Sequence, residues 1–408
     1  MKIIVLIICL FSSFTLMSKL PYSMKTSTDE IDWALLENKS RGQRVKFFAF
    51  GGDPSINRYL VWVSEQLSQR YGIDFQHIKI NSTTDAVSLM LSERSEKQDG
   101  AVSSVDLLWV NGKSFAILKE NQKLLKDWVD VLPNYALLNV TERPFLTKDF
   151  GIPTEGSEVP WGLANLTFYY NSRIIDKKSL PKNPMELLSF TKNSPGRFSY
   201  PAPPEFVGVS FLKQTLSQLA DDPRFYSDVN AINRQEFEQL TYPLWSYLDK
   251  LHPNLYFEGN YFSNSQNTLL RLFDDEILSM GITFNAANLQ GMKIRYDLPK
   301  ETDFFHMPAG SLSNVHFIAI SKFTQNKEAA LVVANFLISP EAQAYKASPE
   351  NWGDKTVLDF SQLTELENTH FKSIPLLQNE ENILSLSEFH PSWDKALTEE
   401  WENRYRYK

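Results

Sequence analysis

Short apolar runs, each followed by a polar turn and then a helical repeat, recur along the chain and predict an α/β protein. In the first unit, Phe47 to Phe50 forms an apolar run typical of a buried strand, and two glycines end it. Asp53 then suits a helix N-cap and Pro54 suits the first helical position, ahead of apolar residues at helical spacing through Tyr71. The pattern therefore predicts a strand, a glycine turn and a capped helix.

Two more units of the same kind follow. Residues 73–80 predict a strand that leads through a polar cap into a helix. Residues 104–121 predict a strand through Trp109, a turn at Asn111, and a helix from about Ser114. Three such units in succession imply a parallel sheet with helices on both faces.

A second set of units follows a proline-interrupted stretch. The expected strands cover residues 160–171, 197–200, 277–284 and 316–321, with helices between them and a strand-to-loop transition after Phe284. A late helix should stop at Ser339 and restart with Pro340 at its first position. The chain should cross between the two sets near Trp161 and near His316. We therefore expect two lobes whose strand ends meet around one cleft.

Length, charge and composition narrow the class of protein. At 408 residues the chain is too long for one ordinary core, and 42% hydrophobic with 22% charged residues is a globular composition. A formal charge of −8, with no basic stripe, argues against a nucleic-acid partner. A mildly acidic surface favours solubility and attracts cationic solutes weakly.

The N-terminus has the pattern of a signal peptide. One lysine precedes an apolar run from Ile3 to Met17, which is short for a membrane span, so we assign residues 1–23 to an exported leader. The single cysteine, Cys9, lies inside this run, so the mature chain would have none for disulfides, thiol catalysis or metal binding. The six histidines are scattered without paired helical spacing. We therefore predict neither a metal site nor a cofactor.

Candidate ligand-binding residues lie in loops at the expected strand ends or at helix starts. They are Gly52, Asp53, Trp109, Asn111, Ser114, Trp161, Glu205, Phe206, Phe284 and Asn285. The aromatic residues, with Asp53 and Glu205, would suit an organic cation through stacking and charge pairing. An anionic or neutral solute, held at a helix N-terminus and by Asn111 with Ser114, is the alternative. Each aromatic also fits a core position, and Asp53 also fits a cap alone.

Five strings in this order resemble the YnjB group of extracellular solute-binding proteins, which belong to ABC transport systems related to thiamine, polyamine and iron binders. They are FGGDPSINRYLVWV, DLLWVNGKSF, PWGLANLTFYYN, FSYPAPPEFVG and MGITFNAANL. The likeness covers about residues 45 to 350. It implies a type II periplasmic-binding fold with a first lobe from residues 44–162 and 313–408 and a second from 163–312. It also implies that the lobes close around solute.

The resemblance also implies a function without catalysis. The protein would be a periplasmic monomer that captures a small solute, thiamine-like or another organic cation, and delivers it to a membrane permease with its ATPase. The alternative is a secreted enzyme on a two-lobed α/β scaffold, such as a carbohydrate-active hydrolase. That chemistry needs two carboxylates facing each other across a substrate.

Overall fold

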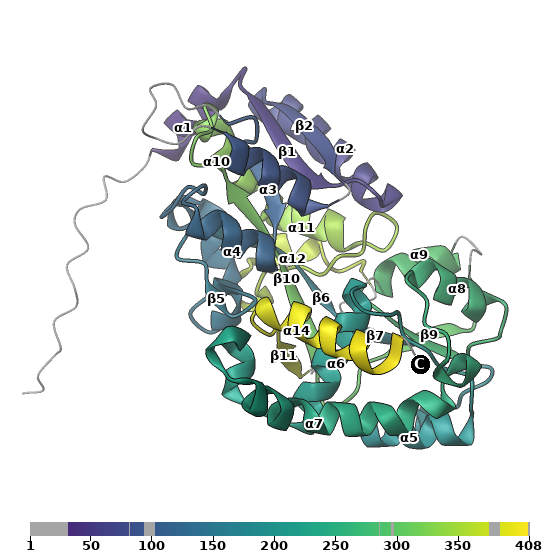
Figure 1. Ribbon diagram of the computed structural model, residues 1–408. Helices are drawn as coiled ribbons and strands as arrows, with labels where there is room; N and C mark the ends of the chain where they lie inside the picture. The colour runs from purple at the N-terminus through teal and green to yellow at the C-terminus, as the bar shows by residue number, and fades with distance from the viewer. Residues whose placement is uncertain are drawn as a thin grey trace, which may run out of the picture.

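The computed structural model describes residues 32–80, 82–93, 103–284, 286–294, 298–374 and 384–406. The predicted leader, residues 1–23, and the predicted site residue Asn285 lie outside these residues. Two lobes, each built on its own sheet, lie one above the other in Figure 1. Within the described part, no helix is both long and apolar enough to cross a membrane.

The first lobe is built on a six-stranded sheet. Its strands are β1 (Arg44–Phe50), β2 (Asp74–Ile80), β3 (Leu107–Val110), β6 (Glu158–Asn165), β10 (Ser311–Ile320) and β11 (Ser385–Ser387). The path runs β2-β1-β3-β10-β11, with β6 also paired to β10. β1 is parallel to β2 and β3, as expected, whereas β10 is antiparallel to β3 and β6. Strand β10 therefore pairs with three strands of this sheet, β3, β6 and β11.

Helices cover both faces of this sheet, as the alternation along β1 requires. The helices are α1 (Trp33–Ser40), α2 (Pro54–Tyr71), α3 (Thr83–Ser92), α4 (Gly112–Glu120), α10 (Lys327–Leu337), α11 (Pro340–Ala347) and α12 (Glu365–Thr369). Phe47 packs in a core with α2 and α10, while its neighbour Phe48 packs with α3 and α4 on the other face. The predicted restart at Ser339 is confirmed, since its hydroxyl accepts a hydrogen bond from the Ala342 N–H.

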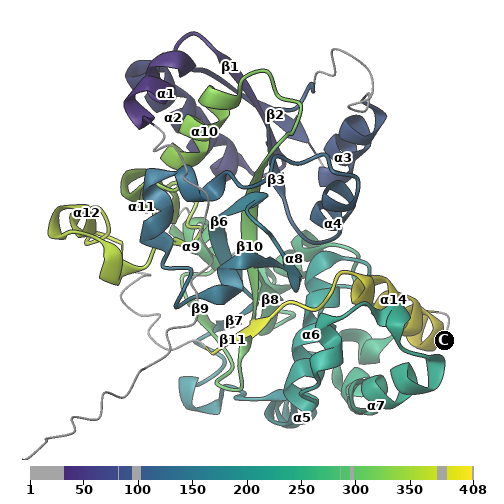
Figure 2. The same ribbon diagram turned by 90° about the vertical axis from the view of Figure 1, so that its left-hand side faces the viewer.

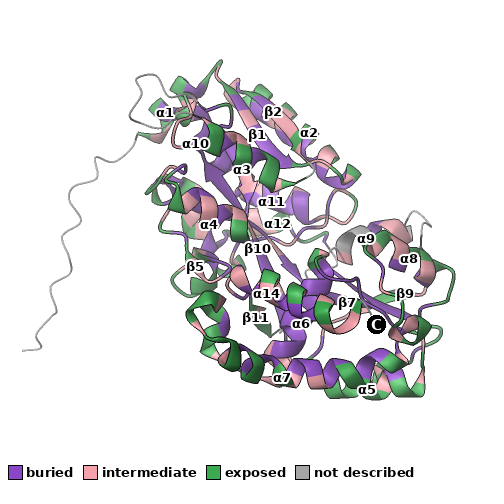
Figure 3. Cartoon of the chain, in the orientation of Figure 1, coloured by how far each residue is buried: buried purple, intermediate pink, exposed green. Residues whose placement is uncertain are grey.

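The second lobe has a three-stranded antiparallel sheet in the order β8-β7-β9. The strands are β7 (Thr167–Asn171), β8 (Met280–Thr283) and β9 (Thr302–Phe305). Its helices are α5 (Pro184–Asn193), α6 (Phe206–Leu219), α7 (Arg234–Leu251), α8 (Gln266–Asp274), α9 (Ala286–Ile294) and α14 (Ser392–Trp401). Figure 3 shows buried residues along the strands and on the inner faces of the helices in both lobes.

Three expected elements differ from the structure. The single strand expected over residues 160–171 is two strands, because the chain leaves one sheet at Leu166 and joins the other. The expected strand over 197–200 makes only an isolated bridge, from Phe198 to Met280. The segment after Phe284 is the helix α9 rather than a loop.

Two strands carry the chain between the lobes. Along β6 and into β7, the packing changes from the first core at Trp161 to the second core at Leu166. Along β10 it changes back between Leu312 and Val315. Because β6 and β10 also pair with each other, they form one antiparallel connection between the lobes, which we call the hinge.

The C-terminal segment returns to the second lobe. Ile374 packs in the first core, whereas Phe389, Trp393 and Leu397 pack in the second. Strand β11 lies beside β10, and α14 contacts α6 (Figure 2). This packing differs from the expected assignment of all of residues 313–408 to the first lobe, and the remaining lobe boundaries stay a prediction.

Candidate functional site

The turn after β1 is held by its own hydrogen bonds. Asp53 Oδ1 accepts a hydrogen bond from the Ser55 N–H at 2.6 Å, which makes Asp53 the N-cap of α2. The Asn57 side-chain amide donates to the carbonyl oxygen of Gly51 at 2.9 Å. A Cβ on Gly51 would lie 2.5 Å from the Cβ of Lys79 on β2, so only glycine fits. The predicted glycine turn and cap are both confirmed.

Substitutions at Asp53 can separate capping from solute contact. Because asparagine caps as well as aspartate, Asp53→Asn should leave the free energy of unfolding nearly unchanged, while Asp53→Ala should lower it by about 1 kcal/mol. If Asp53 also pairs with a cationic solute, both variants should weaken solute binding about tenfold. Urea denaturation and calorimetric titration measure the two effects. Equal stability of the alanine and asparagine variants would contradict the capping role.

Three tryptophans form the centre of an aromatic cluster at the hinge end of the first lobe. The rings of Trp109 and Trp161 lie 5.2 Å apart, and Trp352 lies 5.2 Å from Trp161 and 5.6 Å from Trp109. Phe47 and Tyr59 close the cluster from β1 and α2. Trp161 is fully buried, so it reaches no surface that a solute could touch, contrary to the expectation for this residue. Trp109 is half-buried.

A buried ionic network supports this cluster. The ammonium of Lys346 lies 2.5 Å from Asp354 Oδ2, and His316 Nε2 lies 3.1 Å from Asp354 Oδ1. Burial alone would raise the pKa of Asp354, but the charges of Lys346 and His316 hold that pKa below its usual value. Gly162 makes room for the network, since a Cβ there would overlap the Asp354 carboxylate. The ring of His316 lies 5.3 Å from that of Trp109.

Asn111 directly follows β3, where the sequence places it. Asn111 Nδ2 donates to Asn314 Oδ1 on β10 at 3.2 Å, so it links β3 to the hinge. Ser114 lies half-buried in the first turn of α4, which begins two residues earlier than expected, at Gly112. Asn314 was missed because only the pairing of β10 with β3 brings it near Asn111.

The second lobe presents a carboxylate beside two aromatic rings. Glu205 caps α6, because its Oε2 accepts a hydrogen bond from the Gly208 N–H at 3.0 Å. Gln266 Nε2 donates to Glu205 Oε1 at 3.2 Å. Burial raises the pKa of Glu205, and these hydrogen bonds oppose that shift. The exposed ring of Phe206 lies 5.1 Å from that of Phe284 at the end of β8.

The structure thus sorts the described site residues into three groups. Gly52 and Asp53 form the turn after β1. Trp109, Trp161 and Asn111 lie at the hinge end of the first lobe, and Ser114 lies near them in the first turn of α4. Glu205, Phe206 and Phe284 lie together on the second lobe. Figures 1 and 2 show α9, which follows Phe284, on the same side of the molecule as α2.

Two neighbours of these groups were missed in the sequence. Gln266, which donates to Glu205, is the first residue of α8, and the hydroxyl of Ser265 before it caps that helix. A polar residue at the start of a helix was the one signal in the sequence that could have marked Gln266 as a site residue. Trp352 directly follows Pro349, Glu350 and Asn351, which show no helical or strand pattern, and only the fold brings it to Trp161. Among the described residues, no group of three or more histidine, cysteine, aspartate or glutamate side chains could hold a metal ion.

Sequence comparison places these features in a known family. Residues 63–358 match the family model described as bacterial extracellular solute-binding protein. The chain is also 39% identical over 379 residues to "Protein YnjB" of Escherichia coli (strain K12), covering 93% of this chain and 95% of that protein.

Solved structures share the fold at low sequence identity. An extracellular solute-binding protein from Bordetella parapertussis matches with a TM-score of 0.65 and 12% identity, over 89% of this chain and 98% of that one. The periplasmic binding protein AfuA from Actinobacillus pleuropneumoniae, with fructose-6-phosphate bound, matches with a TM-score of 0.57 and 13% identity, over 90% and 100%. With the sequence match and the two-lobed architecture together, the chain belongs to the bacterial extracellular solute-binding proteins.

Proposed function

We propose that this protein captures a small organic cation between its lobes and delivers it to the permease of an ABC importer. The observation that carries the solute class is the exposed ring of Phe206, which lies 5.1 Å from the partly buried ring of Phe284, beside the half-buried residue Glu205. Aromatic faces and a carboxylate together attract a cation that has an apolar body. Gly52, Asp53 and Asn111 would contact the solute from the first lobe.

Closure of the lobes would complete the site. The two lobes are joined through the hinge of β6 and β10, whose bending would bring α6 toward the turn after β1. Family membership supports an exported protein, and we assign it to the periplasm as a monomer that docks on a membrane permease. The AfuA complex shows that this fold also holds an anionic sugar phosphate, so the fold alone does not choose the solute.

A thermal unfolding screen tests the solute class. The panel contains thiamine and its phosphates, polyamines, fructose 6-phosphate, ferric citrate, amino acids and sugars. A solute at about 100 times its dissociation constant stabilises the protein by about 2.7 kcal/mol, which raises the melting temperature by roughly 5 to 10 °C. A shift with cationic solutes supports the proposal. A shift with fructose 6-phosphate, and none with thiamine or the polyamines, would overturn it.

Phe206→Ala is expected to weaken the binding of the solute that the screen finds by at least tenfold, because stacking and cation–π contacts are lost. Phe360→Ala is a matched control: Phe206 is 42% exposed and Phe360 is 41% exposed. Each ring also has an aromatic neighbour at 5.1 Å, Phe284 and Phe371 respectively. Calorimetric titration of both variants gives the comparison. Equal losses in both would contradict a site at Phe206.

A further inference from the structure

Glu158, the first residue of β6, has a carboxyl group that is buried without a partner. It is 1% exposed, and neither side-chain oxygen has a hydrogen-bond partner in the part of the chain that the structure describes. It lies opposite Ala319 on β10, which is fully buried. Because an ionised carboxylate is strongly disfavoured in such surroundings, a carboxyl group there takes up a proton instead. The burial of Glu158 therefore indicates a neutral side chain.

The cation that acts on Glu158 is engaged elsewhere. The ammonium of Lys119, on α4, donates to the carbonyl oxygen of Pro153 and lies 3.2 Å from Glu155 Oε2. Glu155 is exposed, so this contact holds the ammonium toward the surface. Among the described residues, Lys119 forms no ion pair with Glu158, and Asp127, beside the turn before β6, is acidic as well. Glu158 thus lacks a compensating charge.

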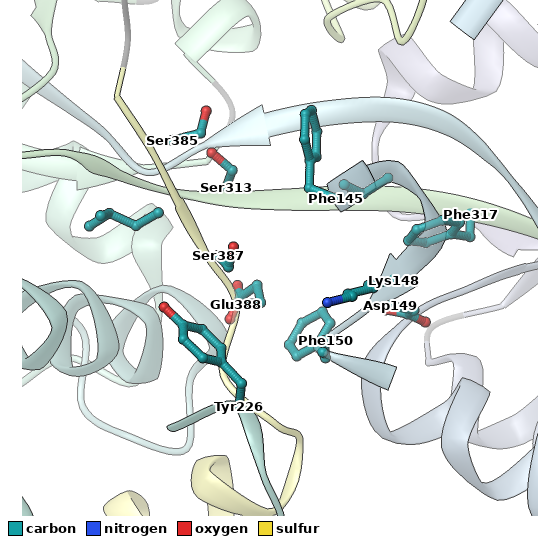
Figure 4. A pocket seen from close by; sticks show the side chains of 13 residues that line it. Phe145, Lys148, Asp149, Phe150, Tyr226, Ser313, Phe317, Ser385, Ser387 and Glu388 are labelled. Carbon is teal, nitrogen blue, oxygen red and sulfur yellow. The ribbon is translucent and has the colours of Figure 1, made fainter. Parts of the chain in front are cut away.

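A second buried carboxyl group lies in the strand β4 (Lys148–Asp149) of the same lobe. Asp149 is fully buried, and its two oxygens accept the Gly112 N–H at 2.8 and 2.9 Å. Figure 4 shows its carboxylate turned away from the ammonium of Lys148, which points into the adjoining cavity. The neighbouring lysine therefore does not neutralise Asp149.

The pKa shifts of the two groups agree with this geometry. Burial raises the pKa of Glu158 well above its usual range, and the negative charge of Asp149 raises it further. Lys119 opposes this shift. Burial also raises the pKa of Asp149, the Gly112 N–H opposes the rise, and the charge of Glu388 adds to it. Negative charge on either member of the pair makes ionisation of the other less favourable.

The pair supports a residue of the proposed solute site. Gly112 directly follows Asn111, which we expect to contact the solute, and its φ of +58° is a left-handed conformation. The hydrogen bonds from Asp149 hold the Gly112 N–H in that conformation. A full charge on Glu158 would repel the carboxylate of Asp149 and weaken its hold on the turn.

We propose that Glu158 carries a proton in the folded protein at neutral pH, and that this proton makes the turn at Asn111 and Gly112 a pH-sensitive part of the solute site. The proton itself does not depend on the proposed function, whereas its link to solute binding rests on it. Alkaline pH removes the proton, and the ionised Glu158 then loosens the turn through Asp149.

Infrared spectroscopy of the full-length protein detects the proton, because the carbonyl stretch of a protonated carboxyl group is separate from the bands of ionised carboxylates. At about pH 7, Glu158→Gln should remove one such band, whereas Glu142→Gln, at an exposed glutamate, should remove none. If Glu158→Gln fails to fold, Asp149→Asn should still show the band of Glu158, since asparagine also accepts the Gly112 N–H. An unchanged spectrum in Glu158→Gln, or no band in Asp149→Asn, would overturn the proposal.

Urea denaturation at several pH values measures the effect of the proton on stability. Because the pKa of Glu158 is higher in the folded chain, the stabilisation by its proton is fully present below the ordinary pKa of 4.5 and is lost as the pH rises through the folded pKa. Between these two values, the unfolding equilibrium constant of the wild type should rise about tenfold per pH unit relative to that of Glu158→Gln. A ratio that stays constant above about pH 5 would contradict a retained proton.

Hydrogen exchange at Gly112 measures the effect on the turn and needs no solute. In the ligand-free wild type, the protection factor of the Gly112 amide should fall about tenfold from about pH 7 to about pH 9, and in Glu158→Gln it should stay constant. The Ala342 amide, which the hydroxyl of Ser339 holds, is the control. Constant protection of Gly112 in the wild type would overturn the pH-sensitive turn. The solute screen bears on the proposed transport function alone.

Discussion

Lys346→Met is expected to lower the free energy of unfolding by about 3–5 kcal/mol, because it leaves a buried carboxylate without its ion-pair partner. Lys346 is fully buried, and its ammonium donates to Asp354 Oδ2, to the carbonyl oxygen of Trp161 at 2.8 Å and to that of Lys355 at 3.0 Å. Methionine fills similar space but supplies none of these donors.

Chemical denaturation measures the loss. Lys395→Met is the control, since Lys395 is 80% exposed and pairs with Glu399 across one helical turn, so its loss should stay below about 0.5 kcal/mol. Adding Asp354→Asn to Lys346→Met should recover part of the stability, because the uncompensated charge disappears. A loss below about 1 kcal/mol for Lys346→Met would show that the ion pair does not hold the hinge end of the lobe.

The same pair gives the wild-type protein a pH dependence. The pKa of folded Asp354 lies below its ordinary value, so the stabilisation is fully present above about pH 4, the pKa of an unfolded aspartate. It is lost as the pH falls through the lower folded pKa. In Lys346→Met, burial without the ammonium should raise the pKa of Asp354, so the deficit against wild type should shrink as the pH falls toward 4.

Gly208→Ala is expected to lower the free energy of unfolding by about 3 kcal/mol and to abolish solute binding. A Cβ at this position would overlap the backbone carbonyl oxygen of Pro201, which cannot move without shifting the loop before α6. Alanine would otherwise stabilise a helix by about 1 kcal/mol relative to glycine, so the clash has to exceed that gain. The shift would displace Glu205 and Phe206 together.

Gly52→Ala is the control for the loss of stability alone, because Gly52 belongs to the proposed solute site. Its Cβ would meet the ring of Phe50 at 2.5 Å, but that ring is 42% exposed and can rotate away. We expect a change in stability below about 1 kcal/mol. Urea denaturation and the thermal shift with the identified solute give both measurements. A stable Gly208→Ala variant that binds solute normally would show that the loop before α6 adapts.

The predictions of helix starts and of the order of strands and helices were confirmed, and they rest on patterns among neighbouring residues. Asp53 and Ser339 each precede a proline that begins a helix, and both accept the hydrogen bond expected of an N-cap. The order of units along residues 44–120 likewise follows from apolar runs and turns. These features depend on neighbouring residues only, so the sequence displays them directly.

The features that the sequence did not reveal depend on distant partners. The apolar run over residues 160–171 continues through Leu166, so its pattern does not mark the change of sheet there. Trp161 looked like a residue at a strand end, but the return of Trp352 buries it. Lys213 and Lys346 read as ordinary polar helix positions, and only the fold pairs them with carboxylates.

The two ends of the described chain are attached to different lobes. Helix α1 packs on α10 in the first lobe, whereas Tyr405, in the last turn η10 (Glu402–Arg406), packs against the second core. A fluorophore at each end would therefore be attached to a different lobe. The efficiency of energy transfer between the two fluorophores would change when the angle between the lobes changes. Because Cys9 is the single cysteine of the sequence, two introduced cysteines could be labelled with little background. The fold thus provides the geometry of an optical biosensor.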